Sequence, residues 1–374
     1  MTIFVVDSMK KGEGLVPMQS DIRLRCEETR TLCEMIFMRT GLTEEAARVV
    51  TDNLLFADLR GIRTHGITRT SLYVSRARRG YYNVAPKFRV LSETSGTILM
   101  DGDNGFGAVN GAEAMRLTIH KAEENGIGLG LVQHSNHYGA ASYFSMMAAK
   151  KGMIGFTCTN GPANMAPTGS AVGLVGTNPF SIAVPNGDSF PLVLDVATSV
   201  VARGKIIDAA KNGESIPVGW AIDDHGKPTT DPNAALLGAV LPFGGHKGSG
   251  MAIMIDILSG VLSGAAFGCH VAQTKSKTEK QNISDIGHMF LVMRISALQS
   301  EQGFESRIRQ MTDELKNASK AQGTEEILLP GEPEARKEAE NLRLGISVSR
   351  AIFAELQKLC ASMDMRNLLE RCIV

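Results

Sequence analysis

The chain has 374 residues, enough for two or three domains of ordinary size or for one enlarged α/β domain. Its 39 lysines and arginines balance 39 aspartates and glutamates, so no global field draws it to nucleic acid or to an anionic membrane. With 43% hydrophobic and 21% charged residues, the composition is that of a globular protein with a sizeable core and excludes a disordered chain.

Cysteine usage and apolar runs indicate the compartment. The six cysteines form no C-x-x-C pair, which is typical of free thiols in a reducing compartment. The apolar run at the start is too short for a signal peptide, and the most apolar stretch, 251–267, carries Asp256 and is too short for a bilayer span. We therefore expect a soluble, cytoplasmic protein without membrane or nucleic-acid partners, and residues 1–20 are expected to be a loose leader.

Residues 21–80 show a helical pattern. Helices are expected over 21–41, 43–61 and 67–80, with a break at 60–66. Thr43 is the expected N-cap of the second helix, and Gly61 lies just past its end.

From residue 96, short apolar runs alternate with amphipathic helices, which is typical of a layered α/β domain. Strands are expected over 96–103, 127–134, 153–160, 180–185, 191–197, 288–296 and, before a turn, in 325–333. Helices are expected over 111–126, 138–152, 199–211, from 245, over about 302–320 and at the end of the chain. Because 180–185 and 191–197 are only a short turn apart, they are expected to pair antiparallel, which predicts a mixed sheet.

Several strong motifs are missing. The chain has no phosphate-loop pattern, no G-x-S-x-G elbow and no H-E-x-x-H, so the main sequence arguments for an NTPase, an α/β-hydrolase and a zinc protease fail. Residues 105–111 (GFGAVNG) imitate a dinucleotide fingerprint, but Asn110 stands where the third glycine belongs, and no second strand ending in an acid follows. A cluster of turn glycines is the better interpretation.

His65, Arg69 and Tyr73 are spaced four residues apart, so on a helix they would share one face. The planar guanidinium suits a carboxylate, and histidine titrates near neutrality. This face could hold a small organic acid while a proton moves at the neighbouring carbon. An exposed polar stripe is the alternative.

His134 and His137 follow the strand predicted over 127–134. Ligands of α/β folds gather at the carboxyl ends of strands, where a helix N-terminus also favours anions. The pair could be half of a metal site, or a polar turn whose histidines are satisfied. No third ligand is evident, so no metal is predicted.

Polar residues also border the neighbouring predicted strands. Asn160 ends one strand, Thr177 and Asn178 precede the next, and Asp195 ends another. If these strands lie side by side, Asn160 and Asp195 share an edge with His137. Asp195 would then orient a histidine or bind a ribose or amide, or it could cap the helix that follows.

Residues 244–250 (GGHKGSG) open an apolar helix. Glycines let the backbone approach a ligand, and Lys247 adds positive charge beside the helix dipole, which favours a phosphate seat over a flexible hinge. Together the four groups predict a binding site for a nucleotide phosphate beside one for a small carboxylate, with two histidines available for proton transfer.

Six segments, in the same order, resemble the type-2 malate/L-lactate dehydrogenases, a family that includes ureidoglycolate dehydrogenase, sulfolactate dehydrogenase, diketogulonate reductase and piperideine-carboxylate reductase. They are RGIRTHGITR (60–69), HSNHYGAASYF (134–144), GTNPFSIAVP (176–185), LDVATSVVARGKI (194–206), SIPVGWAIDDHGKPTTDP (215–232) and GGHKGSGMAIMIDILSGVLSG (244–264). The resemblance implies a nicotinamide-dependent oxidoreductase with a non-Rossmann α/β fold. It also implies a homodimer whose active site lies near the subunit interface.

The resemblance also implies roles for single residues. His65 would be the acid/base that protonates the 2-oxo group, Thr64 and Asp195 would support it in a relay, and Arg69 would grip the substrate carboxylate. His137 would sit against nicotinamide and substrate, and in some members it is the base. Further substrate contacts are expected from Tyr73, Thr177 and Asn178. Cofactor contacts are expected from His137, Asn160, Asp195, Val196, Ala197, His246, Lys247, Gly331 and Glu332. Thr64 stands where many members carry serine; the hydroxyl is kept, and the added methyl restricts its rotamer.

We predict a layered α/β/α domain with a mixed, non-Rossmann sheet over 96–334, which binds the cofactor, and a smaller helical, substrate-side domain from 21–95 with 335–374. The predicted reaction is hydride transfer between NAD, or NADP, and a small 2-hydroxy acid, malate or lactate by default. Ureidoglycolate, sulfolactate or a cyclic imino acid is the alternative substrate. A metal-dependent hydrolase or lyase using His134 and His137, or an inactive binding protein, is the alternative from another class. The prediction requires the stretches near 65 and 137 to converge.

Overall fold

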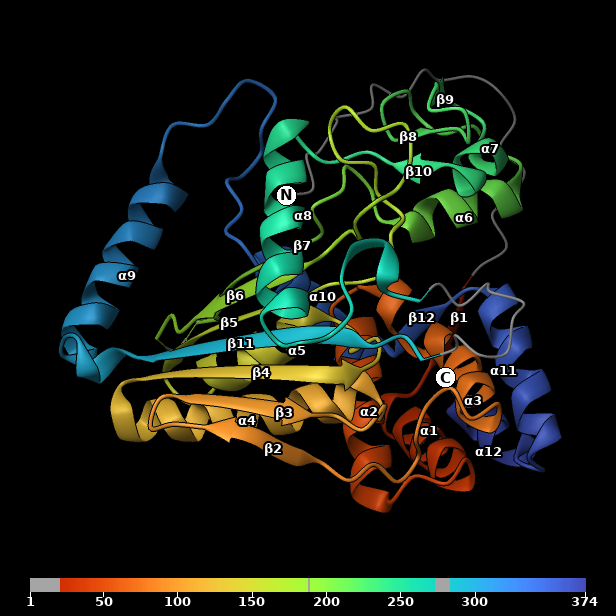
Figure 1. Cartoon of the computed structure of the whole chain (residues 1–374), viewed down its shortest axis with the longest axis horizontal. Coiled ribbons are helices and arrows are strands. Elements are labelled where there is room, and N and C mark those ends of the chain that lie inside the picture. The colour runs from red at the N-terminus through yellow and green to blue at the C-terminus, as the bar shows by residue number, and fades with distance from the viewer. Residues whose placement is uncertain (1–20, 188, 273–282) are drawn as a thin grey trace.

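A computed structural model describes residues 21–187, 189–272 and 283–374 (Figure 1). The predicted leader, 1–20, lies outside the described residues. No helix in the described part of the chain has both the length and the apolarity needed to cross a membrane.

The centre of the molecule is a seven-stranded mixed sheet with the strand order β2-β3-β4-β11-β5-β6-β7. The strands are β2 (Arg89–Glu93), β3 (Thr97–Asp101), β4 (Ile127–Ser135), β5 (Met153–Thr159), β6 (Phe180–Val184), β7 (Leu192–Val196) and β11 (Ile286–Arg294). Among the strands of this sheet in the described residues, only β3 and β4 pair in parallel. The predicted antiparallel pairing of β6 with β7 is confirmed. The late strand β11 lies between β4 and β5 and is antiparallel to both.

Helices cover both faces of this sheet, as expected for an α/β/α arrangement (Figure 1). On one face, α4 (Gly107–Asn125) and α5 (Ala141–Ala149) pack against Val132 and Phe290. On the other, α8 (His246–Asp256) packs against Leu131 and Met289. Neighbouring residues of one strand point to opposite faces, so the two packings place the helices on opposite sides.

Both ends of the described chain share one helical core. It is built from α1 (Cys26–Arg39), α2 (Glu44–Leu59), α3 (Thr70–Arg78), α11 (Arg350–Ser362) and α12 (Arg366–Cys372). Thr43 caps α2 as predicted, since its hydroxyl accepts a hydrogen bond from the Ala46 N–H at 3.2 Å. The helix predicted from residue 21 is wrong at its start. Residues Ile22–Leu24 form β1, which pairs with β12 (Ile346–Val348) from the far end of the sequence.

The remaining elements surround the sheet. They are α6 (Arg203–Asn212), α7 (Pro232–Leu237), β8 (Ala221–Ile222), β9 (Pro228–Thr229), β10 (Ala239–Val240), the π-helical turn η3 (Ile257–Val261) that continues α8, the 3₁₀ turns η4 (Gly268–His270) and η5 (Ile295–Ala297), α9 (Glu301–Asn317) and α10 (Glu332–Leu344). Strands β8, β9 and β10 form a separate small sheet. The strand predicted at the start of 325–333 is wrong, because 325–329 adopts no strand conformation in the described structure and the segment leads through a turn into α10. Strand β2 was not predicted, and it places 89–93 in the large sheet, not in the helical part.

Candidate active site

Two histidines from distant parts of the chain lie face to face. His65 ends the 3₁₀ turn η1 (Arg63–His65), and His137 lies between β4 and α5. Their rings are stacked, with centroids 5.3 Å apart and planes 19° apart, and both side chains are half-buried. The structure therefore brings together the two stretches whose convergence the predicted chemistry requires.

The segment that carries His65 is not the start of one helix. Two 3₁₀ turns, η1 and η2 (Ile67–Arg69), precede α3, and Gly66 between them is extended. Asp58 of α2 holds this bend, because its Oδ2 accepts a hydrogen bond from the Ile67 N–H at 2.7 Å. A Cβ at Gly66 would lie 1.9 Å from Asp58 Oδ1, so the bend requires glycine here. The predicted single helical face is thus wrong.

Tyr73 nonetheless reaches the pair from α3. Its hydroxyl lies 2.7 Å from His137 Nδ1, and the Gly139 N–H donates to the same nitrogen at 3.3 Å. Since an N–H only donates, Nδ1 is an acceptor and the proton of the neutral ring is on Nε2. The tyrosine hydroxyl is thus engaged with His137, and its predicted contact with substrate stays a prediction.

Thr64 and Arg69 complete the cluster. The Thr64 hydroxyl lies 2.9 Å from His65 Nδ1, and Arg69 Nε donates to the Thr64 carbonyl at 2.6 Å. Among the described residues, the two terminal nitrogens of Arg69 form no hydrogen bond. Two unpaired N–H-bearing nitrogens in one plane match the two oxygens of a carboxylate.

Both imidazoles are neutral near pH 7. Burial lowers the pKa of His65 to about 3, and the charge of Arg69 acts in the same direction. Burial also holds the pKa of His137 well below its ordinary value, with Arg69 again contributing. A neutral imidazole can take a proton from a hydroxyl group, which a protonated one is unable to do.

Asp195 lies in β7, close to the start of α5. Its Oδ2 accepts a hydrogen bond from the Ser142 N–H at 2.9 Å, and burial raises the pKa of its carboxyl. The alternative that Asp195 caps the following helix is wrong, because α6 begins only at Arg203. The described hydrogen bonds of Asp195 do not include one to His65, so the relay between them stays a prediction.

The chain after Asp195 links the candidate cofactor segments. The Thr198 N–H donates to the Thr177 carbonyl at 2.9 Å, and the Thr198 carbonyl accepts from the Phe243 N–H at 3.0 Å, just before α8. Farther along, a Cβ at Gly204 would lie 2.9 Å from Thr64 Cγ2, so α6 begins beside the histidine turn. Val196 and Ala197 lie at the start of this link and are half-buried.

The start of α8 has the features of an anion site. Gly245 precedes the helix with a φ of +61°, and the side chains of His246 and Lys247 are exposed. The N–H groups of Lys247 and Gly248 bond to the preceding turn at 3.3 and 2.9 Å, so the Lys247 ammonium and the helix dipole carry most of the attraction. The predicted contact of this segment with a phosphate stays a prediction.

Gly331 also lies next to β7. The Pro330 carbonyl accepts from the Val193 N–H at 3.0 Å, and Gly331 has a φ of +84°. A Cβ at Gly331 would lie 3.0 Å from Val193, so glycine allows this close approach. The turn at Gly331 therefore lies against β7 at Val193, two residues before Asp195.

Comparison with known proteins decides the family. The family model described as malate/L-lactate dehydrogenase matches residues 24–357. The chain belongs to this family. A malate dehydrogenase from Pyrococcus abyssi is 38% identical over 355 residues, which cover 93% of this chain and 96% of that protein. The solved sulfolactate dehydrogenase from Methanocaldococcus jannaschii has a TM-score of 0.85 and 36% identity, covering 93% of this chain and 99% of that one. Ureidoglycolate dehydrogenase (NAD(+)) from Escherichia coli K12 is 33% identical over 335 residues, covering 90% of this chain and 95% of that protein.

As a member of this family, the enzyme is an oxidoreductase, as predicted. Its mixed, seven-stranded sheet with helices on both faces agrees with the predicted fold class.

Three residues predicted to bind ligands have side chains that bond to other parts of the dehydrogenase. Asn178 has no exposed surface, and its Nδ2 donates to the Ala252 carbonyl at 2.8 Å. Asn160 is 3% exposed and bonds to Asp256, to the Ala266 carbonyl and to the Gly287 N–H. The ligand contacts predicted for Asn160 and Asn178 stay predictions. Local sequence did not show that both side chains also bond to other parts of the fold.

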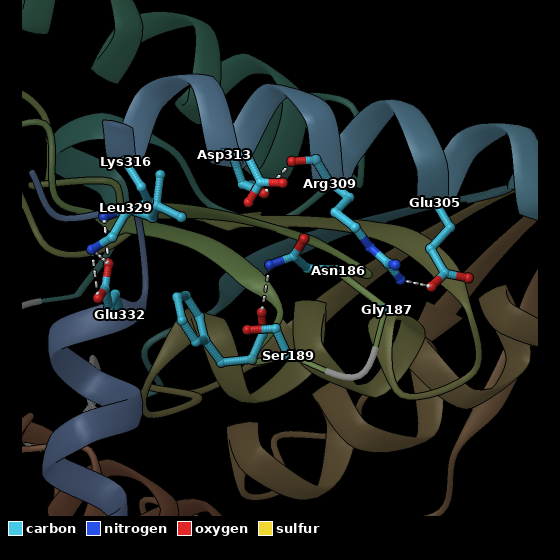
Figure 2. Close-up of a pocket in the computed structure, with 11 residues that line it drawn as sticks. Asn186, Gly187, Ser189, Glu305, Arg309, Asp313, Lys316, Leu329 and Glu332 are labelled. Atoms are coloured by element: carbon cyan, nitrogen blue, oxygen red, sulfur yellow. Dashed lines mark hydrogen bonds and ion pairs between the residues drawn. The ribbon is translucent and has the colours of Figure 1, made fainter. Parts of the chain in front are cut away.

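Glu332 is the third. It is 5% exposed, accepts from Lys316 Nζ at 2.9 Å and from the Leu329 N–H at 2.9 Å, and pairs with Arg336. It borders a cavity of about 610 Å³ between α9 and the β6–β7 turn (Figure 2). The residues that line this cavity include neither His65 nor His137, so it is separate from the histidine pair.

The two histidines of the possible metal site have different partners. His134 Nδ1 lies 3.1 Å from Asp101 Oδ1, whereas His137 faces Tyr73 and His65. This arrangement gives a shared metal site no support.

Sequence reasoning missed Asp58, whose carboxyl sets the bend that carries His65. The available signal was an acidic residue on the apolar side of the second helix, where it has to be buried. Asp58 is 5% exposed, and burial raises the pKa of its carboxyl to about 7 from an ordinary value of 3.8.

We expect Asp58→Asn to stabilise the dehydrogenase relative to wild type increasingly as pH rises. Between pH 3.8 and about 7 the folded protein holds a proton on Asp58 that the unfolded chain has lost, so wild-type stability falls with rising pH. The asparagine is neutral throughout and still offers an oxygen to the Ile67 N–H. Urea unfolding at pH 4 to 8.5 measures the difference, which grows up to about pH 7 and is constant above it.

Asp101→Asn is the matched control with the opposite sign. Although burial opposes it, hydrogen bonds from the Asp103 N–H, Arg89 and His134 lower the pKa of Asp101. Relative to wild type, Asp101→Asn should therefore become less stable as pH rises through the acidic range, because the ionised carboxylate of Asp101 stabilises the folded protein. The same trend in both variants would contradict the assignment for Asp58.

Proposed function

We propose that this dehydrogenase transfers a hydride between NAD and a small 2-hydroxy acid, with malate and its 2-oxo form, oxaloacetate, as the leading pair. The observation that carries the proposal is the stacked, neutral pair His65–His137 beside the unpaired end of Arg69. Support for the substrate class and for NAD comes from the printed names of the relatives, malate dehydrogenase and ureidoglycolate dehydrogenase (NAD(+)).

Arg69 would hold the substrate by its carboxylate. Its Nε is fixed on the Thr64 carbonyl, so the plane of the guanidinium is set before substrate arrives. A carboxylate in this grip would also offset the positive charge that lowers the pKa of both histidines, which makes proton uptake by His65 easier once substrate is bound.

His65 would exchange a proton with the substrate oxygen. The Thr64 hydroxyl beside Nδ1 can donate to a bare nitrogen or accept from an N–H, so it supports His65 before and after proton transfer. His137, with its proton on Nε2, would donate a hydrogen bond to the same oxygen. Bound NAD supplies the nicotinamide carbon that accepts or releases the hydride.

Residues at the end of β7 and the start of α8 would hold the cofactor. Lys247 and the helix dipole would attract the diphosphate, and 195–197 with Gly331 would line the rest of the path. Asp195, which accepts a hydrogen bond from the Ser142 N–H at the start of α5, would keep the end of β7 in place relative to His137.

A panel of 2-oxo acids with NADH and with NADPH tests the proposal. We expect the highest kcat/KM for oxaloacetate with NADH, and lower values for pyruvate, sulfopyruvate and cyclic imines. A stronger reaction with NADPH, or with another acid, would replace that part of the proposal. No reduction of any 2-oxo acid or imine, in protein that binds NADH, would overturn it.

We also propose a homodimer, formed through an apolar surface of α8, η3 and the loop that follows η3. This surface consists of Met254, Ile257, Val261, Leu262 and Phe267, each of which is between 42% and 57% exposed. No other element in the described part of the chain covers these side chains. They are therefore exposed to water, which is unfavourable for an apolar surface of this size. Because the chain resembles a family of homodimers, we expect a second copy of this chain to cover the surface.

We also propose that the protein is cytoplasmic. The six free cysteines agree with the reducing compartment that the sequence predicts.

We expect Met254→Glu to convert the dimer to a monomer. Met254 is 57% exposed, so a charge there is tolerated in the single chain but not in an apolar interface. Light scattering after size-exclusion chromatography gives the mass. Leu298→Glu, at a position 80% exposed elsewhere, is the control and should leave the mass unchanged. A wild-type monomer would contradict the proposed assembly.

A further inference from the structure

We propose that His288, in β11, is a positioning residue that fixes the loop carrying His137. The inference rests on the proposed role of His137 in the reaction, but its structural part can be tested without substrate.

His288 links three strands in the interior of the sheet. Its side chain has no exposed surface, and β11 lies between β4 and β5. On one side, Nε2 is 2.8 Å from the Ser135 hydroxyl at the end of β4. On the other, Nδ1 is 2.7 Å from the Thr159 hydroxyl at the end of β5. The His288 ring thus connects the ends of β4 and β5, and the loop that carries His137 starts at the end of β4.

The two hydroxyls that hold His288 have further partners of their own. Asn110 Nδ2 donates to the Ser135 hydroxyl at 2.9 Å and to the Gly102 carbonyl at 3.2 Å, which fixes the orientation of this amide. The Thr159 hydroxyl has the Gly287 and Asn160 carbonyls as acceptors at 2.9 and 3.1 Å. Because each hydroxyl can both donate and accept, the two bonds hold the neutral ring between β4 and β5.

The buried His288 ring is uncharged within this chain of bonds. Burial lowers the pKa of His288 to about 3, so the ring is neutral under working conditions. Chains of buried hydrogen bonds that are fully satisfied hold their members in one arrangement.

This arrangement reaches His137 from both sides. Ser135 lies two residues before it, and Tyr138 follows it directly. The Tyr138 ring is stacked on the His288 ring, with centroids 4.7 Å apart and planes 7° apart. Between them, Asn136 Nδ2 donates to the Asn104 and Gly105 carbonyls at 3.0 and 2.9 Å. The backbone on either side of His137 is therefore held, and its ring is directed at His65.

Two variants of His288 separate the hydrogen bonds from the packing. His288→Phe keeps a ring against Tyr138 but removes both hydrogen bonds. His288→Gln keeps an amide oxygen that can accept from Ser135. We expect kcat to fall about 10- to 100-fold in the phenylalanine variant and less in the glutamine variant, with the KM for the 2-oxo acid and the Kd for NADH changed less than about threefold.

The triple variant Ser135→Ala, His288→Phe, Thr159→Val tests whether a fall in kcat is caused only by loss of folding. Replacing all partners by apolar groups of similar shape restores much of the stability. We expect its melting temperature to recover but its kcat to remain low. Val292→Ala, at a buried position farther along the same strand face, is the matched control and should lower the melting temperature without changing kcat.

Histidine-selective ¹⁵N NMR supplies a readout independent of activity. The chain has only eight histidines. In wild type, His137 should show its proton on Nε2, and the His137 signal should shift or broaden in His288→Phe. Folded variants with unchanged kcat and an unchanged His137 signal would overturn the inference. Absence of 2-oxo acid reduction in wild type, with the NMR effect present, would instead overturn the proposed function.

Discussion

Replacing His65 with asparagine is expected to lower kcat by about 10²- to 10⁴-fold, the usual range for loss of a general acid/base. Asparagine can still form a hydrogen bond with Thr64, but it neither takes up nor releases a proton. The Kd for NADH should change less than about twofold, because the segments expected to hold the diphosphate lie at α8 and β7. Steady-state kinetics and nicotinamide fluorescence measure the two quantities.

The control is His120→Asn. His120 lies on α4 with a side chain that is 60% exposed, far from the histidine pair in the fold, and its replacement should leave kcat unchanged. If His65→Asn retained wild-type kcat, His65 would not be the proton carrier. His137→Asn would then be the next variant to measure, since its ring is stacked on the ring of His65.

The second large effect is expected from Arg69→Lys, on substrate capture. Arginine uses Nε for the Thr64 carbonyl and keeps two further nitrogens for the carboxylate. A lysine ammonium is a point charge and does not serve both partners in one plane. We expect the KM for the 2-oxo acid to rise about 10- to 100-fold, about 1.4 to 2.8 kcal/mol of binding free energy, with a smaller change in kcat.

Chemical rescue distinguishes a lost grip from a disturbed fold. Adding guanidinium ion to Arg69→Ala should restore part of kcat/KM, because the ion fits the space left by the side chain. Arg78→Lys, at an exposed position of α3, is the control and should leave KM unchanged. A KM for Arg69→Lys equal to that of wild type would contradict the assignment of Arg69 to the substrate carboxylate.

Much of the fold could be predicted, because its elements are set by local patterns. The succession β4, α5, β5 follows from apolar runs and helical periodicity within some thirty residues, and the N-cap of α2 depends only on Thr43 and the next three residues. The failures have a common cause. The helix predicted from residue 21 starts as β1 only because a strand from the other end of the chain pairs with it.

The candidate site divides in the same way. Residue types and spacing selected His65, Arg69, His137 and Lys247 as candidates, and the first three lie together in the structure. They did not show that the side chains of Asn160, Asn178 and Glu332 bond to partners in other elements. Polarity is a local property, whereas the partner that satisfies a polar group is decided by packing.

What the amino-acid sequence determined by itself is therefore most of the order of strands and helices from residue 96 onward, the mixed character of the sheet and the chemical groups available for catalysis, since each depends on neighbours along the chain. The tertiary structure alone decided that β11 enters between β4 and β5, that Asp58 bends the chain at Gly66, and that Tyr73 bonds to His137. Each of these depends on a close contact between segments that the sequence separates, and such contacts exist only once the core has formed.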